Sequence, residues 1–443
     1  MLSDTSDVYK TVRNGREAGA TIAEIVQENF DDQGFKTTLV LNPLHKFPPG
    51  VLDLIFQHMT GSEIITQSEV STDFYNFIAG SKACMGKINL KLDSRLKVFT
   101  NEDKELLIGS GRNYENLKVA TFKRFLQPAK DILSTPDRCW SNVSITGVDF
   151  ETVNDALEFL FTFQSTVEQL HMERVYILKD DPNSHVDLQF PKLKILEMKC
   201  CQALLYPMAF DVCTNLIHFT IKSGSQISSA ALNGIRKILV SNEKLKVLRV
   251  QYSVVNLIFS EDISSKVHFK LTEFHADDLY REPGQQAIKE NLNRFLIKQS
   301  ATLEEVSIDE WMDAKLMKTI LTMPLIKAVT LNGFDHLVPP LECEDFETHN
   351  KSIVNLNFKL FVNDFLYKIL PALPNLKSLV VKNLDQRTMD ILPNACSDLD
   401  TLSASIFYFQ TVSDKKFFKK LQKFTCVKGG YKRFDPEDSL ISL

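Results

Sequence analysis

The chain has 443 residues, of which 44 % are hydrophobic and 24 % are charged, with a formal net charge of −5 and a pI of about 6.0. These proportions are typical of a folded protein and exclude wholesale disorder. The slight acidity argues against a nucleic-acid binder, which needs a basic surface to displace the counterions of phosphate groups.

Several features bear on the cellular compartment. The eight cysteines are scattered without paired CxxC spacing, which predicts a reducing compartment. The first ten residues, MLSDTSDVYK, have neither the basic start nor the apolar stretch of a secretory leader. No apolar run reaches the roughly 18 residues of a membrane-spanning helix. We therefore expect a cytoplasmic or nuclear protein.

The N-terminal part is expected to hold a mobile tail, residues 1–45, and a small helical module, residues 46–85. Pro48 suits the start of a first helix, Gly61 is expected to end it, and Ser62 is a plausible N-cap for a second. Apolar residues at helical spacing mark three short helices: Val51, Leu52, Ile55, Phe56 and Met59; then Ile64 and Ile65; then Val70, Phe74, Phe77 and Ile78.

This module resembles an F-box, the part of a protein that docks onto the Skp adaptor of a cullin–RING ubiquitin ligase. Phe47-Pro48 stands where the F-box pattern has Leu-Pro, and apolar residues follow at the positions of its first helix. The departures from the pattern are Phe47 for Leu, Gly50 for Glu, Ser71 for Cys and Phe74 for Trp. The resemblance implies that the adaptor is contacted by Pro48, Leu52, Ile55, Phe56 and Ile64.

A repeat fills residues 114–430, after an expected connector at 86–113 and before an expected C-terminal tail at 431–443. Its pattern is LxxLxL, and successive copies begin 22 to 32 residues apart. The copies begin at Tyr114, Trp140, Val167, Leu193, Leu216, Leu245, Leu271, Leu303, Ile326, Ile353, Leu376, Leu399 and Leu421. The alternating end of each copy predicts a short strand, and stretches with helical spacing lie between copies, for example at residues 153–161.

The pattern is similar to that of leucine-rich repeats, which have periods of about 20–29 residues. It predicts an α/β solenoid, a horseshoe with parallel strands on the concave side and helices on the convex side. The asparagine or cysteine that this family has three residues after the last apolar position is mostly missing. Cys201 fits, whereas Gly224, Phe334 and Leu384 do not, so we expect irregular convex turns.

An F-box followed by leucine-rich repeats is the arrangement of substrate-recognition subunits of SCF-type E3 ubiquitin ligases. The resemblance implies a non-catalytic subunit that reaches the cullin and RING subunits through the Skp adaptor and holds a substrate protein on its repeats. We expect no catalytic residues, no cofactor, no metal site, no nucleic acid and no membrane partner. The alternative is a leucine-rich-repeat scaffold without a ligase role, in which the helical module caps the array and hides its apolar face against the first repeats.

The expected substrate site follows from strand geometry, because the variable positions of each copy point out of the core. Its middle part is acidic, which favours a basic segment of the substrate. The candidate substrate-binding residues are His171, Glu173, His218, Lys222, Arg249, Glu273, His275, Asp277, Glu305 and Asp309.

Overall fold

A computed structural model describes the chain in several stretches. These are residues 49–93, 105, 107–120, 127–134, 138–179, 188–201, 205, 209–222, 227–251, 265–277, 285–308, 314–331, 348–358, 363–408, 417 and 421–426. The expected tails at 1–45 and 431–443 lie outside them. The chain divides into two compact units, Met1–Leu205 and Tyr206–Leu443.

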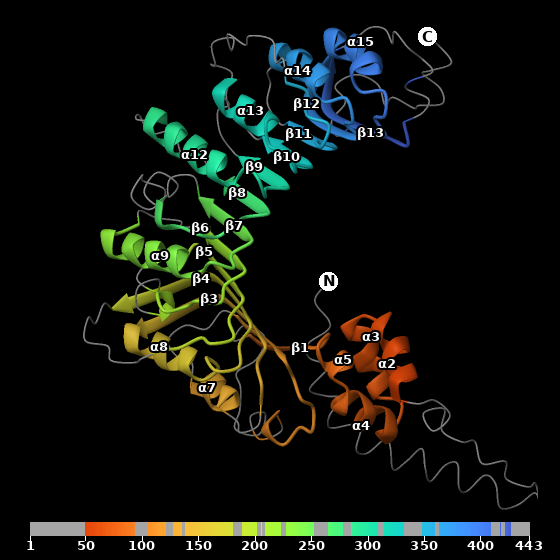
Figure 1. Cartoon of the computed structure of the whole chain (residues 1–443). Coiled ribbons are helices and arrows are strands. Elements are labelled where there is room, and N and C mark those ends of the chain that lie inside the picture. Colours follow the sequence, from red (N-terminus) through yellow and green to blue (C-terminus); the bar gives the residue numbers. More distant parts are fainter. Residues whose placement is uncertain are drawn as a thin grey trace, which may run out of the picture. The chain divides into compact units, whose positions relative to one another are not determined.

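The first unit contains a bundle of short helices where the sequence predicted three. The helices are α2 (Pro49–Gln57), α3 (Gly61–Ser68), α4 (Thr72–Gly80) and α5 (Lys82–Met85), as Figure 1 shows. Helix α3 begins with a capping box, in which the Thr60 hydroxyl accepts from the Glu63 N–H and the Glu63 carboxylate accepts from the Thr60 N–H at 2.7 Å. The prediction that Ser62 caps this helix is therefore wrong, because Thr60 does so and Gly61 is the first helical residue.

An aromatic cluster forms the core of this module. The Phe56 ring stacks on Phe77, with centroids 5.8 Å apart, and meets the edge of Phe74 at 6.5 Å. The Ser81 hydroxyl donates to the Asp53 carboxylate at 2.6 Å, which joins α2 to the start of α5. The other buried apolar residues of the helices include Leu52, Ile64 and Ile78.

The strands of the first unit are all parallel and pair in chain order. They are β1 (Asn89–Asp93), β2 (Asn116–Ala120), β3 (Asn142–Thr152), β4 (Gln169–Lys179) and β5 (Ile195–Lys199), with helices α7 (Gln127–Leu133) and α8 (Val153–Phe161) between them. Strand β1 lies within the expected connector. The LxxLxL pattern does not reveal this strand, because Lys87 stands three residues before Leu90, where the pattern requires an apolar residue.

The second unit continues the same alternation of parallel strands and helices. Its strands are β6 (His218–Lys222), β7 (Val247–Gln251), β8 (Glu273–Asp277), β9 (Glu305–Ile308), β10 (Ala328–Leu331), β11 (Asn355–Phe358), β12 (Ser378–Asp385), β13 (Thr401–Tyr408) and β14 (Lys423–Cys426). Its helices are α9 (Ser229–Ser241), α12 (Gln285–Gln299), α13 (Ala314–Leu321), α14 (Asn363–Ile369), the 3₁₀ helix η3 (Leu370–Ala372) and α15 (Gln386–Ala395).

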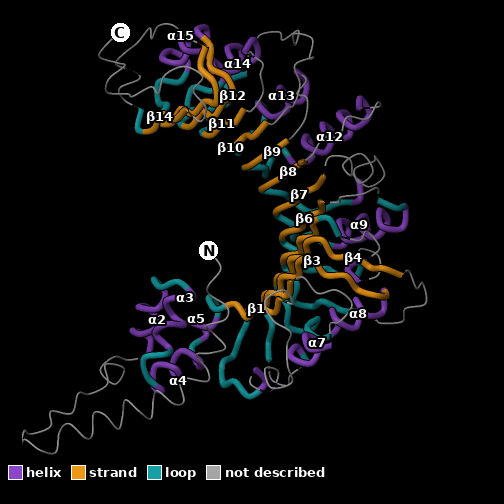
Figure 2. Tube along the Cα trace, turned by 180° about the vertical axis from the view of Figure 1, so that it is seen from behind, coloured by secondary structure: helices purple, strands orange, loops and turns teal. Residues whose placement is uncertain are grey.

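The strands from β2 to β13 bury the last two apolar positions of their LxxLxL copies. In β5, Leu196 and Met198 are fully buried, while Ile195 and Glu197 are partly exposed. Helix α8 packs on β3 and β4, and α14 and α15 pack on β12, so the helices cover the buried side of the strands (Figure 2). This is the predicted leucine-rich-repeat solenoid, in which neighbouring repeats bury a continuous core.

Buried amides stabilise the turns that precede several strands of the second unit. The Asn242 side chain is fully buried, donates to the carbonyls of Cys213 and Ile238 at 2.7 and 2.6 Å, and accepts from the Leu216 N–H at 2.7 Å. Gln299 accepts from the Leu271 N–H at 2.9 Å. Asn350 donates to two carbonyls of the preceding turn at 2.9 Å each. Each amide lies a few residues before the strand that follows the one whose turn it stabilises, whereas the family pattern has its asparagine directly after a strand.

Candidate functional site

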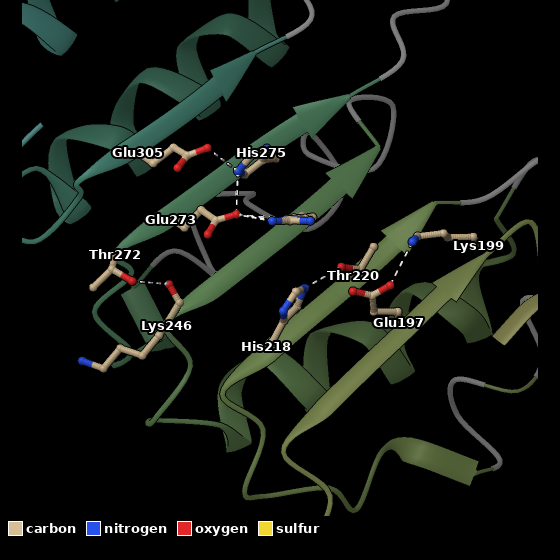
Figure 3. Close-up of polar contacts among 10 residues, drawn as sticks. Glu197, Lys199, His218, Thr220, Lys246, Thr272, Glu273, His275 and Glu305 are labelled. Atoms are coloured by element: carbon tan, nitrogen blue, oxygen red, sulfur yellow. Dashed lines mark hydrogen bonds and ion pairs between the residues drawn. The ribbon is translucent and has the colours of Figure 1, made fainter. Parts of the chain in front are cut away.

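The side chains on the open face of the strands, opposite the helices, form the first candidate site. In the first unit they bring together His171 on β4 with Glu197 and Lys199 on β5, since His171 pairs with Glu197 in the backbone register. The Glu197 carboxylate lies 3.3 Å from His171 Nδ1 and 2.9 Å from Lys199 Nζ. Figure 3 shows the contact with Lys199. Glu173 lies beside them, opposite Lys199 in the register and 3.6 Å from Arg174 Nε.

The electrostatics of this group favour an ionised Glu197. The hydrogen bond from His171 lowers the pKa of Glu197 most, partial burial opposes it, and Lys199 lowers it further. The result is a pKa well below the ordinary 4.5 of a glutamate. The group is therefore a fixed negative charge with two cationic or cation-capable neighbours, and its atoms remain partly open to solvent.

In the second unit a larger polar group spans β7, β8 and β9. Arg249 donates to Glu273 Oε1 through Nε at 3.1 Å and through a terminal nitrogen. His275 Nε2 lies 2.7 Å from the same Glu273 oxygen and 3.4 Å from Glu305 Oε1 (Figure 3). Burial raises the pKa of Glu273, but Arg249 and nearby histidines outweigh it and lower the pKa overall. On β6, His218 Nε2 lies 2.9 Å from Thr220 Oγ1.

The structure brings some of the predicted substrate-binding residues together and separates others. Arg249, Glu273, His275 and Glu305 form one group. Lys222 ends β6, and Asp277 ends β8 opposite Gln251. Asp309 lies outside the described residues. Glu197 and Lys199 were not among the predicted residues, although they occupy the variable positions of the copy that begins at Leu193.

The second candidate site is an apolar stripe on α2, formed by Val51, Leu54 and Ile55, which are 38 %, 58 % and 48 % exposed. Spacings of three and four residues place them on one face of the helix. Val70, after α3, is also 59 % exposed. Of the residues expected to contact the adaptor, Ile55 belongs to this stripe. Leu52, Phe56 and Ile64 are buried inside the module, and Pro48 lies outside the described residues.

Polar contacts tie the helical module to the segments that precede β1 and β2. The Lys87 ammonium donates to the carbonyls of Phe56, Gln57 and Met59 at the C-terminal end of α2. The Arg112 guanidinium donates to Ser68 Oγ at 2.6 Å and lies over the Tyr75 ring, 5.0 Å from its centroid. The module is thus joined through α3, α4 and the end of α2, whereas the α2 stripe stays exposed.

Repeated parallel strands, helices on one side and LxxLxL copies define a leucine-rich-repeat fold. No protein-family model matches the chain, and no curated protein matches it. Among solved structures, the chain is similar to a leucine-rich-repeat protein of Leptospira interrogans, with 10 % identity, a TM-score of 0.32 and coverage of 77 % of this chain and 90 % of the other. Within the described residues, no helix is both long enough and apolar enough to cross a membrane.

Proposed function

We propose that this chain is the substrate-recognition subunit of an SCF-type ubiquitin ligase. In this role the helical module docks onto the Skp adaptor, and the open face of the repeats holds a substrate protein. The observation that carries the proposal is the exposed stripe of Val51, Leu54 and Ile55 on α2, within a stretch that resembles an F-box.

The stripe is chemically suited to a protein partner. Large apolar side chains side by side on a surface mark interaction sites more often than single exposed ones do. Burying one such side chain completely is worth about 1.5–3 kcal/mol. The stripe therefore offers apolar surface that can anchor an adaptor, and Val70 is a further exposed apolar side chain of the module.

The open faces of the repeat strands suit the second half of the role. Glu197 in one unit and Glu273 in the other are partly exposed charges with fixed partners. Charges held in this way select complementary partners more than they add affinity. The chain itself performs no bond chemistry in this scheme. It raises the effective concentration of a substrate lysine near the ubiquitin-loaded enzyme.

Co-purification with a Skp adaptor tests the proposal. We expect the wild-type chain to capture the adaptor and the double variant Leu54→Asp with Ile55→Asp to lose it, because two charges would enter an apolar contact. The matched control is Ile297→Asp on α12, where Ile297 is 54 % exposed. Circular dichroism checks that all three proteins are folded. Failure of the wild type to capture the adaptor, or equal capture by the double variant, would contradict the proposal.

A repeat scaffold with a helical cap is the second candidate function. The contacts of Lys87 and Arg112 favour it, since they attach the module to the segments that precede β1 and β2, as a cap would be attached. On this alternative the α2 stripe has no adaptor, and the two aspartates leave every interaction of the chain unchanged. The same co-purification therefore separates the two functions.

A further inference from the structure

Two carboxylates and an imidazole converge on the open face of β8 and β9. Glu273 and His275 are two residues apart on β8 and so point to the same face. Glu305 on β9 is the direct register partner of Glu273. One ligand atom of each of the three residues lies within 4.8 Å of the other two, and all three side chains are half-buried. Figure 3 shows them pointing toward one another.

Two carboxylates, Glu273 and Glu305, lie directly opposite each other in this arrangement. Like charges directly opposite on neighbouring strands destabilise a sheet. Arg249 supplies one positive charge, and among the described residues it hydrogen-bonds to Glu273. Glu305 has His275 as its neighbour, at 3.4 Å. One guanidinium therefore stands beside two carboxylates in this group, and a further cation would reduce the repulsion between them.

The imidazole shows which kind of cation suits the site. His275 Nε2 is shielded from solvent and has no hydrogen-bond partner in the described part of the chain, although Glu273 Oε1 is only 2.7 Å away. A nitrogen in this position is available as a metal ligand. Zn²⁺ accepts nitrogen and oxygen ligands at about 2.0–2.2 Å, so ligand atoms in a tetrahedral site are about 3.3 Å apart. The observed 2.7 and 3.4 Å bracket that spacing.

We propose that Glu273, His275 and Glu305 form a binding site for a divalent transition-metal ion, with Zn²⁺ as its preferred occupant. The nitrogen ligand favours such an ion over Mg²⁺ or Ca²⁺, which take oxygen ligands. Three protein ligands leave one tetrahedral position open toward the exposed face of the strands. Arg249 holds the Glu273 carboxylate in place by hydrogen bonding, as outer partners of metal ligands do. The site goes beyond the proposed ligase role and does not depend on it.

The first unit provides a matched contrast. There His171 also contacts a carboxylate, Glu197, but Glu197 contacts Lys199, which offers an ammonium and not a second carboxylate. A histidine and one carboxylate offer two ligand atoms, so this group lacks the third ligand that Glu305 supplies in the second unit. His171 therefore serves as the control histidine.

Calorimetric titration of the full chain with ZnSO₄ tests the site. The chain also has thiols. Burial raises the pKa of Cys213 and of Cys396 to about 12, which keeps them protonated at neutral pH, whereas Cys139 is exposed. Bound zinc is therefore assigned by comparing the wild type with variants. We expect His275→Ala and Glu305→Gln each to weaken one binding event by at least ~tenfold, and His171→Ala to leave it unchanged.

Thermal unfolding with and without Zn²⁺ gives a second measurement. An ion that binds only the folded chain raises its melting temperature, and this rise should vanish in Glu305→Gln, which preserves the size of the side chain. If His275→Ala fails to fold, Glu305→Gln alone still tests whether zinc binds at this site. Equal zinc affinity in the wild type, Glu305→Gln and His171→Ala, or no zinc binding by the wild type, would overturn the proposal.

Discussion

The turns before the strands and the open faces of the strands use polar side chains in opposite ways. In the turns, Asn242, Gln299 and Asn350 are almost completely buried and hydrogen-bond to backbone groups. On the open faces, Glu197 and Glu273 are partly exposed and pair with other side chains. The first set is part of the fold, whereas the second leaves charge available to a partner or an ion. Burial should therefore rank the effect of substitutions on stability.

Substitution of Asn242, a fully buried side chain, should lower the stability of the chain most. Asn242→Leu removes the partners of two carbonyls and one N–H that lie in the core. Each buried polar group left without a partner destabilises the fold by about 1–3 kcal/mol, so we expect the free energy of unfolding to fall by about 3 kcal/mol or more. The midpoint of urea unfolding, followed by circular dichroism, measures it. Asn233→Leu on the exposed side of α9 is the control, and an equal loss there would contradict the ranking.

A half-buried contact should have an intermediate effect. Lys87→Met removes the ammonium that caps the C-terminal carbonyls of α2, and we expect a loss of about 1.5–2 kcal/mol. Hydrogen exchange should quicken in α2 and remain unchanged in α9. Lys82→Met, at an exposed position of α5, controls for the loss of a positive charge. Unchanged exchange in α2 would show that the cap adds nothing to stability.

A smaller effect, dependent on pH, is expected at Glu197. Its pKa in the folded chain is below the ordinary 4.5, so its contribution is fully present above about pH 4.5 and is lost as the pH falls toward the folded pKa. Glu197→Gln should therefore lower the free energy of unfolding by about 1 kcal/mol at pH 7 and by less at pH 3. Urea midpoints at both pH values measure this, with the exposed Glu290→Gln as control. A loss that grows on acidification would contradict the assigned ion pairs.

The smallest effect is expected for an exposed ion pair. Lys179 and Glu151 lie 2.6 Å apart, with side chains 67 % and 50 % exposed. Exposed pairs of this kind contribute roughly 0–1 kcal/mol, so Lys179→Ala should change the urea midpoint least of the four substitutions. A loss as large as that of Lys87→Met would show that burial does not set the order.

The sequence predicted the repeated part well, because burial there imposes a visible period. The helical spacing at 153–161 corresponds to α8, and the copy at Leu193 corresponds to β5. The sequence did not reveal the buried amides, since an asparagine such as Asn242 at the end of a helix resembles an ordinary turn residue. The sequence also did not tell which apolar residues of α2 are buried and which are exposed, because the buried Leu52 and the exposed Ile55 are equally apolar.

Each of the buried amides completes a turn that lies earlier in the chain. Asn242 binds the turn before β6, Gln299 the turn before β8, and Asn350 the turn before β10. Each of these turns is therefore completed by a side chain that the ribosome adds 25 to 30 residues later. When one of these three turns emerges during synthesis, it lacks its partner until the following residues emerge, so folding there should lag about one repeat behind translation. A chain shortened from its C-terminal end should then fray at its new last repeat.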